Sequence, residues 1–126
     1  MDENEISRKI IGAAIEVHRA LGPGLLESAY HQCLMHEMRL QGLSYESEAP
    51  IVINYKGFCI GEAYRIDLLV ENKVIVELKA VDNLLDIHKA QLLTYLRSMD
   101  RRLGLLINFN ETILKNGVKR LVNKLL

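Results

Sequence analysis

The chain has 126 residues, of which 49% are hydrophobic and 25% charged, an ordinary composition for a globular protein. Its 16 basic and 16 acidic residues cancel to a formal net charge of zero, which argues against a protein that coats nucleic acid through bulk charge. Apolar runs stay shorter than the roughly 20 residues of a membrane span, and the acidic start is unlike a signal peptide. We therefore expect one domain over residues 1–126, cytoplasmic and without a membrane segment.

The two cysteines, Cys33 and Cys59, are too few and too unpatterned for a disulfide framework or a cysteine-based zinc site. Free cysteine commonly behaves as a small buried hydrophobe. We expect both side chains to be buried.

Apolar residues at helical spacing predict a first helix over about 4–21, with a polar cap near Asn4. Gly22 and Pro23 then end it, because glycine tolerates a positive φ and proline cannot continue the hydrogen-bond ladder.

A second helix is predicted over about 25–41, ended by Gly42. Glu27 falls in its first turn, where the helix dipole favours an anion, so a surface glutamate that complements the dipole is one interpretation. It also lies beside the inward stripe, which leaves a functional role open. The apolar stripe comprises Leu26, Ala29, Tyr30, Cys33, Leu34, Met38 and Leu40.

The pattern then changes to strands. One is predicted over about 46–55, a turn at Lys56-Gly57, a second strand over 58–70 with a bend at Gly61, and a third over 74–80. Three consecutive strands pair most simply as an antiparallel meander.

A further helix begins near Asp82 or Asp86, one of which would serve as its cap, and runs to about residue 98. Residues 103–109 form a continuous apolar run, as in a strand buried on both faces. The side chains that the helix offers to the core are Ile87, Ala90, Leu93, Leu96 and Met99.

The tail over 113–126 is ambiguous between a helix and a strand through 117–122. It is also distinctly basic, which is consistent with a solvated face or with a nucleic-acid contact. The basic residues are Lys115, Lys119, Arg120 and Lys124.

The predicted order is therefore helix, helix, three strands, helix, strand and a terminal element. A strand-helix-strand unit after a meander implies a mixed sheet with helices on both faces. The expected fold class is α/β: a mixed sheet with an antiparallel three-strand meander, then helix and strand, flanked by helices.

The hairpin over residues 65–79 carries charges in a mostly apolar setting. If its pairing is centred on Asn72, Asp67 lies opposite Glu77, and Lys79 shares the face of Glu77 because side chains alternate. Two facing carboxylates repel, and a divalent ion such as Mg²⁺ or Mn²⁺ removes the repulsion. Lys79 could then orient or deprotonate a metal-bound water. The alternative is a charged outer face or a cross-strand ion pair.

Residues on the helices could complete such a site. Glu27 could supply a further carboxylate through water if the second helix packs over this face of the sheet. Gln91 could hold the attacking water or Lys79. His88, Gln91 and Tyr95 form one line along the later helix. Taken alone, His88 is typical of a surface histidine, and Tyr30 and Tyr95 are typical of core residues.

Together, these residues resemble the PD-(D/E)xK nuclease superfamily, whose core has the order helix, three-stranded meander, helix, strand. More narrowly, Gly24-Leu-Leu-Glu-Ser-Ala-Tyr30 is similar to the signature of the GxxExxY proteins, a small bacterial and archaeal family placed in that superfamily. The other segments that resemble this family are Leu21-Gly-Pro-Gly-Leu-Leu-Glu, Tyr64-Arg-Ile-Asp-Leu-Leu-Val, Val76-Glu-Leu-Lys-Ala, His88-x-x-Gln91-x-x-x-Tyr95 and Gly104-Leu-Leu-Ile-Asn-Phe109.

The resemblance implies a metal centre at the hairpin. Asp67 and Glu77 would be direct ligands of Mg²⁺ or Mn²⁺, with the main-chain carbonyl of Leu78 as a third. The proline that usually precedes the metal aspartate is replaced by Ile66, as in the looser variants of the superfamily.

The resemblance also assigns the neighbouring residues. Lys79 would be the catalytic lysine, Glu27 the helical acid and Gln91 the later motif residue. Tyr30, His88 and Tyr95 would support them.

Three functions follow from this pattern. The first is a Mg²⁺-dependent nuclease that hydrolyses phosphodiester bonds, with DNA preferred to RNA as substrate; a two-fold dimer would suit a duplex cut on both strands. The second is a non-catalytic accessory module that keeps the nuclease fold and binds nucleic acid or a protein, with Lys115, Lys119 and Arg120 as the nucleic-acid contacts. The third gives the charged patch a structural role only.

Overall fold

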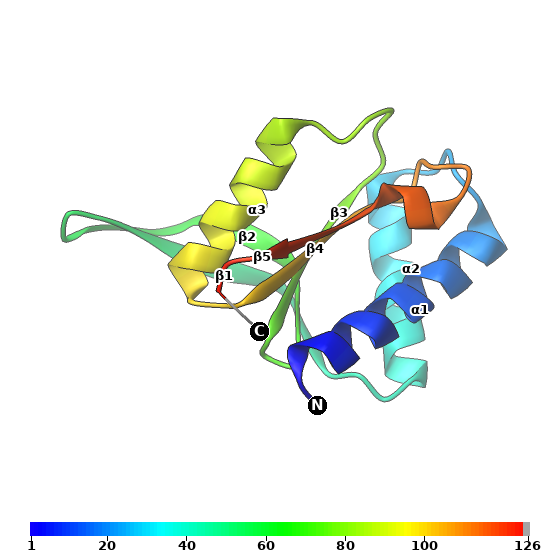
Figure 1. Cartoon of the computed structure of the whole chain (residues 1–126), viewed down its shortest axis with the longest axis horizontal. Coiled ribbons are helices and arrows are strands. Elements are labelled where there is room, and N and C mark those ends of the chain that lie inside the picture. The colour runs from blue at the N-terminus through cyan, green and yellow to red at the C-terminus, as the bar shows by residue number, and fades with distance from the viewer. Residues whose placement is uncertain (125–126) are drawn as a thin grey trace.

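The computed structural model describes residues 1–124, apart from the side chain of Ala63 (Figure 1). Its five strands form one sheet in the order β1-β2-β3-β4-β5. The β3–β4 pair is parallel and the other pairs are antiparallel, so the predicted mixed sheet with a three-strand meander is confirmed. The elements are α1 (Glu3–Leu21), α2 (Glu27–Leu40), β1 (Tyr45–Tyr55), β2 (Phe58–Val70), β3 (Val74–Lys79), α3 (Asp86–Met99), β4 (Leu103–Asn108), the 3₁₀ helix η1 (Leu114–Gly117) and β5 (Val118–Val122).

Helices cover both faces of the sheet. Figure 1 shows α1 and α2 on one side and α3 on the other. Buried side chains of α1, α2 and one sheet face form what we call the α1–α2 core, which includes Leu68, Val76 and Leu78. Those under α3, with Ile66 and Ile75 among them, form the α3 core. Within the described residues, no helix combines the length and apolar character that crossing a membrane requires.

The ambiguous tail is a strand. Val118–Val122 pairs with β4, so the helical alternative is wrong for these residues. The last two residues of the 113–126 segment lie outside the described part. The strand outcome has a clear cause, because β4 is buried along its whole length and its free edge needs a hydrogen-bonding partner.

The expected cap of α1 was misplaced by two residues. Asp2 is the cap, and its Oδ1 accepts a hydrogen bond from the Glu5 amide at 2.8 Å, so Asn4 is not the capping residue. The end of the helix was predicted correctly, since Gly22 takes φ +69° there.

The start of α3 is capped by an imidazole. The Leu85 amide donates to Nδ1 of His88 at 3.0 Å, and Leu85 occupies the N-cap position. Neither Asp82 nor Asp86 is the cap, so both alternatives were wrong. His88 thus satisfies a backbone donor of its own helix.

Several side chains expected in the core are exposed. Cys33 and Cys59 both face solvent, and Leu26 and Leu40 are 78% and 69% exposed. The buried stripe of α2 is narrower than predicted and consists of Tyr30, Leu34 and Met38. In α3, Ile87 and Ala90 are likewise exposed, and the helix packs through Leu92, Tyr95 and Leu96.

The β2–β3 hairpin has the predicted register. Leu68 pairs with Val76 and Val70 with Val74, around a turn in which Asn72 has φ +56°. Regular pairing stops at Leu68–Val76, one pair before Asp67 and Glu77.

The β1–β2 hairpin extends beyond the sheet as an arm (Figure 1). Its turn, Lys56-Gly57, has positive φ at both residues, as in a type I′ turn. The register shifts between Ile51 and Ile53, across from the bend expected near Gly61.

Two glycines make a testable contrast in packing. A Cβ added at Gly117 would lie 2.5 Å from the Asn108 carbonyl oxygen, whereas one added at Gly12, on the exposed face of α1, would meet nothing within 4 Å. We expect Gly117→Ala to lower the free energy of unfolding by about 1–3 kcal/mol. Gly12→Ala should raise it by about 0.5–1 kcal/mol. Urea denaturation measures both, and equal effects would contradict the close packing of Gly117.

Candidate metal centre at the end of the hairpin

The site forms where two strands exchange faces. On a regular strand, residues two apart share a face. Leu68 nevertheless belongs to the α1–α2 core and Ile66 to the α3 core. In β1, Tyr45 packs against the α1–α2 core, whereas Ala49 lies in the α3 core. Both strands therefore change phase within the same short stretch.

The exchange is centred on Glu48 and Asp67. The β1–β2 ladder passes from the pair Ser47–Leu68 to the pair Ala49–Ile66 and omits the residues between. Glu48 has φ +56°, which is uncommon for a residue with a side chain. As a result, two carboxylates lie at the crossover instead of on a regular strand face.

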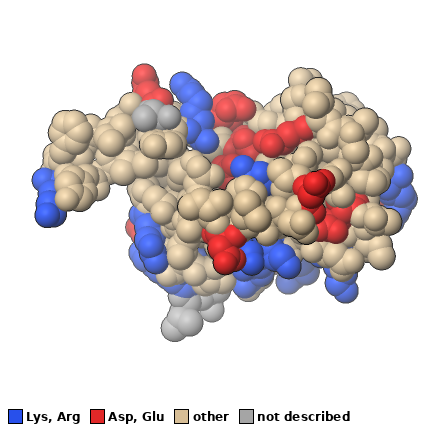
Figure 2. Space-filling model, turned by 90° about the horizontal axis from the view of Figure 1, so that it is seen from above, with Lys and Arg blue, Asp and Glu red and all other residues tan. Residues whose placement is uncertain are grey.

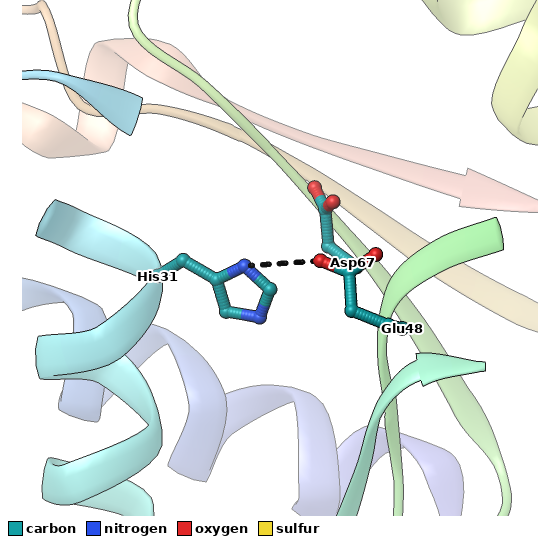
Figure 3. Close-up of side chains that lie close together, drawn as sticks. All are labelled: His31, Glu48 and Asp67. Carbon is teal, nitrogen blue, oxygen red and sulfur yellow. Dashed lines mark ion pairs between the residues drawn. The ribbon is translucent and has the colours of Figure 1, made fainter. Parts of the chain in front are cut away.

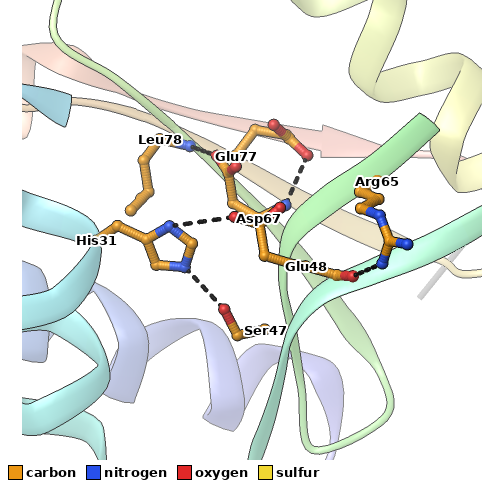
Figure 4. Close-up of polar contacts among 7 residues, drawn as sticks. All are labelled: His31, Ser47, Glu48, Arg65, Asp67, Glu77 and Leu78. Carbon is orange, nitrogen blue, oxygen red and sulfur yellow. Dashed lines mark hydrogen bonds and ion pairs between the residues drawn. The ribbon is translucent and has the colours of Figure 1, made fainter. Parts of the chain in front are cut away.

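Asp67 and Glu77 continue the hairpin through their side chains (Figure 4). The Asp67 amide donates to Oε1 of Glu77 at 3.2 Å, and the Leu78 amide donates to Oδ2 of Asp67 at 2.8 Å. These bonds replace the backbone pair that would have followed Leu68–Val76. The two acids expected opposite each other are thus held together, although by side-chain bonds.

Glu77 is only 7% exposed. Burial raises the pKa of its carboxyl to about 8, and the negative charge of Asp67 adds to the shift, while Lys79 opposes it. In the absence of a cation, Glu77 therefore retains a proton at neutral pH. A metal ion would have to displace that proton, as metal binding at acidic ligands generally does.

Lys79 ends β3 and is half-buried. It pairs in register with Asn108, and alternation places it on the face of Glu77, while Leu78 lies in the opposite, α1–α2 core. Its positive charge opposes the rise in pKa of both Glu77 and Glu27. Lys79 is thus an electrostatic neighbour of both carboxyls.

Glu27 is the first residue of α2 and is exposed. Partial burial raises the pKa of its carboxyl, and the charge of Asp67 is the next cause. Glu27, on α2, is therefore close enough to Asp67 for the two charges to interact.

Tyr30 explains the spacing of the Gly24 to Tyr30 motif. Its hydroxyl donates to the Gly22 carbonyl at 2.6 Å and accepts from the Leu25 amide at 3.1 Å. Its ring stacks on Phe109 with a centroid separation of 4.6 Å. The loop before α2 is thereby tied to the end of β4, which fixes where α2 presents Glu27.

Gly24 completes this attachment. Its amide donates to Oδ1 of Asn110 at 3.1 Å, and its φ of +98° favours glycine. We call the bonds of Tyr30 to this loop the loop clamp. Tyr30 thus supports the site by fixing the loop before α2, and it adds no charged group to the site.

Asn108 secures the chain that follows Lys79, and the sequence interpretation missed it. Its fully buried amide accepts from the Val81 amide at 3.1 Å and donates to the Val81 carbonyl at 2.8 Å. The Phe109 amide also donates to the Lys79 carbonyl. The signal that could have found it is an asparagine at the end of an otherwise apolar buried strand.

On the sheet face that α3 covers, Tyr95 approaches Glu77. It is 5% exposed, its ring is tilted against that of Tyr64, and the charge of Glu77 adds to burial in raising the pKa of its hydroxyl. Gln91 is exposed and lines, with Tyr95, a cavity of about 310 Å³ between α3 and the arm. His88 is instead engaged at the N-terminus of its helix.

The structure adds His31 and Glu48 to the site (Figure 3). Nδ1 of His31 lies 3.9 Å from Oε1 of Glu48, and one donor atom from each of His31, Glu48 and Asp67 lies within 4.8 Å of the others. His31 could have been noticed because it follows Glu27 by one helical turn. Glu48 offered no such signal. Regular alternation along β1 would point its side chain toward α3, away from His31 on α2.

The basic residues of the tail do not gather on one surface. Lys119 and Arg120 are consecutive on β5, so their side chains point to opposite faces, and Arg120 bonds Asn4 of α1. Lys115 lies in η1, beside His18 and Arg19. Figure 2 shows acidic and basic side chains interspersed over the face in view.

Two comparisons with known proteins bear on this arrangement. The sequence model of the PD-(D/E)XK nuclease superfamily matches residues 4–121. A solved structure entitled "Crystal structure of SSO0001" superposes with a TM-score of 0.55 at 22% sequence identity, which supports the fold. That alignment covers 98% of this chain and 60% of the other, so the chain spans about three fifths of its length. No curated protein matches.

Removal of the Tyr30 hydroxyl tests the loop clamp. Tyr30→Phe keeps the stacked ring but loses two hydrogen bonds, so we expect the free energy of unfolding to fall by about 1–2 kcal/mol. Amide exchange at Leu25 should also accelerate. Tyr55→Phe, on the exposed end of the arm, is the matched control and should change neither measurement. Unchanged exchange at Leu25 in Tyr30→Phe would refute the clamp.

The raised pKa of Glu77 has a signed consequence for the metal-free protein. Between pH 4.5 and about 8, the folded state binds a proton on Glu77 that the unfolded chain has lost, so this group lowers stability as pH rises. We expect Glu77→Gln to remove a slope of up to about 1.4 kcal/mol per pH unit. Urea denaturation with a chelator measures it. Glu46→Gln, exposed on β1, should keep the wild-type slope. If the stability of Glu77→Gln depended on pH with the same slope as the wild type, the raised pKa of Glu77 would be refuted.

Proposed function

The chain belongs to the PD-(D/E)XK nuclease superfamily, and from this premise we propose that it is a divalent-metal-dependent nuclease that hydrolyses phosphodiester bonds of DNA. The observation that carries the proposal is the contact of Asp67 with the buried Glu77, made through the Asp67 amide and the Glu77 carboxylate. Two carboxyls in this contact need either a shared proton or a cation. Their oxygen donors suit Mg²⁺ or Mn²⁺.

The donor set fits such an ion. Asp67 and Glu77 would hold it, and the main-chain carbonyl of Leu78 would be a third ligand. When bound, the ion would neutralise charge on the scissile phosphate and lower the pKa of a coordinated water. The hydrogen bond from the Leu78 amide orients the Asp67 carboxylate, which supports this role.

The remaining residues act around that centre. Lys79, whose charge already acts on Glu77 and Glu27, would position the attacking water and stabilise negative charge on the phosphate. Glu27 would contribute a carboxylate through water. Gln91 and Tyr95 line the cavity between α3 and the arm, where a substrate would extend along α3.

We further assign the chain to the GxxExxY proteins. Each residue of that signature has a distinct role in the structure: Gly24 allows the positive φ of the loop, Glu27 begins α2, and Tyr30 clamps the two together. The two cores lie on opposite faces of a single sheet, which supports one domain over residues 1–126. A cytoplasmic location and a two-fold dimer on duplex DNA complete the proposal.

A second function has its own support. The arm exposes Val52, Tyr55 and Phe58 to 54%, 64% and 68%, as a protein-binding surface would. The alternative is therefore an accessory module that keeps the nuclease fold without turnover. The dispersed positions of Lys115, Lys119 and Arg120 weaken a version of it that binds nucleic acid through the tail.

Cleavage assays decide between the two functions. The purified protein is incubated with supercoiled, linear and single-stranded DNA, and with RNA, in Mg²⁺ or Mn²⁺. We expect DNA cleavage that falls by about 10²–10⁴-fold in Lys79→Ala and disappears in Asp67→Asn. Lys73→Ala, in the turn of the same hairpin, is the matched control and should cleave as the wild type does.

Two results would count against the nuclease. Equal cleavage by wild type and Lys79→Ala would indicate a contaminant. Absence of cleavage on every substrate, with nucleic-acid or protein binding that survives Asp67→Asn, would select the accessory module instead.

A further inference from the structure

The cavity between α3 and the arm has a neutral, partly aromatic lining. Ile53 and Tyr64 come from the arm, and Ile87, Gln91 and Tyr95 are among the residues that α3 contributes. None of the described residues that line it carries a charge, so it offers no partner to a phosphate or a carboxylate. Its volume of about 310 Å³ is at the lower end of the range for small-molecule pockets, about 300–1,000 Å³. The cavity therefore suits one flat, neutral ring system.

Tyr95 brings an unpartnered hydroxyl to this cavity. The residue is 5% exposed, yet its hydroxyl makes no hydrogen bond within the described part of the chain. A tyrosine hydroxyl in such a position usually has a partner. Every fully buried polar side-chain atom of the described residues has one, so the Tyr95 hydroxyl reaches open space. It is thus left to bond a ligand.

Tyr64 offers an aromatic surface beside that hydroxyl. It is 44% exposed, and its ring lies tilted by 49° against the ring of Tyr95 at a centroid separation of 6.4 Å. That contact supports the ring from one side and leaves its exposed surface free for stacking. The amide of Gln91, which is also exposed, can both donate and accept a hydrogen bond. Proteins hold an unpaired nucleobase with this combination of aromatic stacking and hydrogen bonds to the base edge.

The cavity is close to the Asp67–Glu77 centre. Tyr64 precedes Asp67 by three residues on β2, a rise of about 10 Å along a strand. Burial and next the charge of Glu77 raise the pKa of the Tyr95 hydroxyl, and Tyr64 and Asp67 add to the rise. The hydroxyl therefore lies within electrostatic reach of both acids and stays protonated at neutral pH. A base in the cavity would belong to a nucleotide near the scissile phosphate.

We propose that this cavity binds one unpaired base of the substrate strand, stacked on Tyr64 and hydrogen-bonded at its edge by Tyr95 and Gln91. The inference deepens the proposed function and rests on it for the choice of DNA. A base inside a duplex is paired and stacked, so it can enter such a pocket only after it has flipped out. The preferred substrate is therefore a single strand, or a duplex that carries an unpaired nucleotide.

Fluorescence anisotropy with end-labelled oligonucleotides tests the pocket. Ca²⁺ replaces Mg²⁺, and a gel verifies that the strand stays intact. The ligands are a single strand, its duplex, and a strand of equal length with abasic sites in place of its bases. We expect the wild type to bind the single strand about tenfold or more tighter than the other two.

Two substitutions at Tyr64 separate stacking from other effects. Tyr64→Leu removes the ring and should weaken binding of the single strand by about 5–150-fold. It should leave binding of the abasic strand unchanged, because that strand has no base to stack. Tyr64→Phe is the matched control: it keeps the ring and should bind close to the wild type. Circular dichroism establishes that each variant is folded.

Tyr95→Phe gives an independent readout. Its hydroxyl has no partner within the described part of the chain, so urea denaturation should show unchanged stability, while binding of the single strand weakens. Gln91→Leu should weaken the same binding. Gln32→Leu, an exposed glutamine on α2, is the control and should bind as the wild type does.

The outcomes separate this inference from the nuclease proposal. Equal affinity for the three ligands, no binding of any strand, or wild-type binding by Tyr64→Leu would overturn the base pocket; Lys79-dependent cleavage would still leave the nuclease standing. A preference for the single strand that depends on Tyr64, without cleavage in Mg²⁺ or Mn²⁺, would support the pocket and count against the nuclease. Equal binding of an RNA strand of the same sequence would support the pocket and count against a choice of DNA.

Discussion

The exchange of hydrogen bonds between Asp67 and the strand beside it is the constraint on which the site depends. The Asp67 amide is satisfied by Glu77, and the Asp67 carboxylate is satisfied by the Leu78 amide. A backbone ladder would have met both needs without any charge. By ending the ladder one pair early, the hairpin places two carboxyls where neutral peptide groups would otherwise lie. The charge of the two acids therefore lies where the regular pairing of the hairpin ends.

That early end is coupled to the crossover of the sheet. A strand that kept its phase would point the side chain of Ile66 toward α1 and α2, and Glu48 would face α3. The actual exchange leaves both cores filled, with Ile66 and Ala49 under α3 and Leu68 under the other helices. Glu48 and Asp67 lie at the crossing point and belong to neither core. The acids are therefore near the centre of the fold without being inside either hydrophobic cluster.

Much of this arrangement could be predicted from the sequence, because its causes are local. The apolar strands β2 and β3 and the turn at Asn72 determine the register of their hairpin. That register brings Asp67 next to Glu77. The mixed sheet follows from the order of elements. What escaped prediction depends on contacts between distant segments: Cys33 is exposed because α2 buries only a narrow stripe, and His88 turns to its own helix end. Glu48 was missed because its positive φ has no signal in the sequence.

The local charge has a consequence for any phosphate-bearing substrate. The chain is neutral overall, yet Asp67, Glu48, Lys79 and His31 act electrostatically on Glu27, and Asp67 and Lys79 act on Glu77. Such a cluster repels phosphate unless its charge is compensated. The tail lysines and arginine are too dispersed to provide that compensation from the side, since Lys119 and Arg120 face opposite ways. If the site takes a phosphodiester, as proposed, the attraction would have to come from bound cations, and the residues that hold the metal would then also determine substrate affinity.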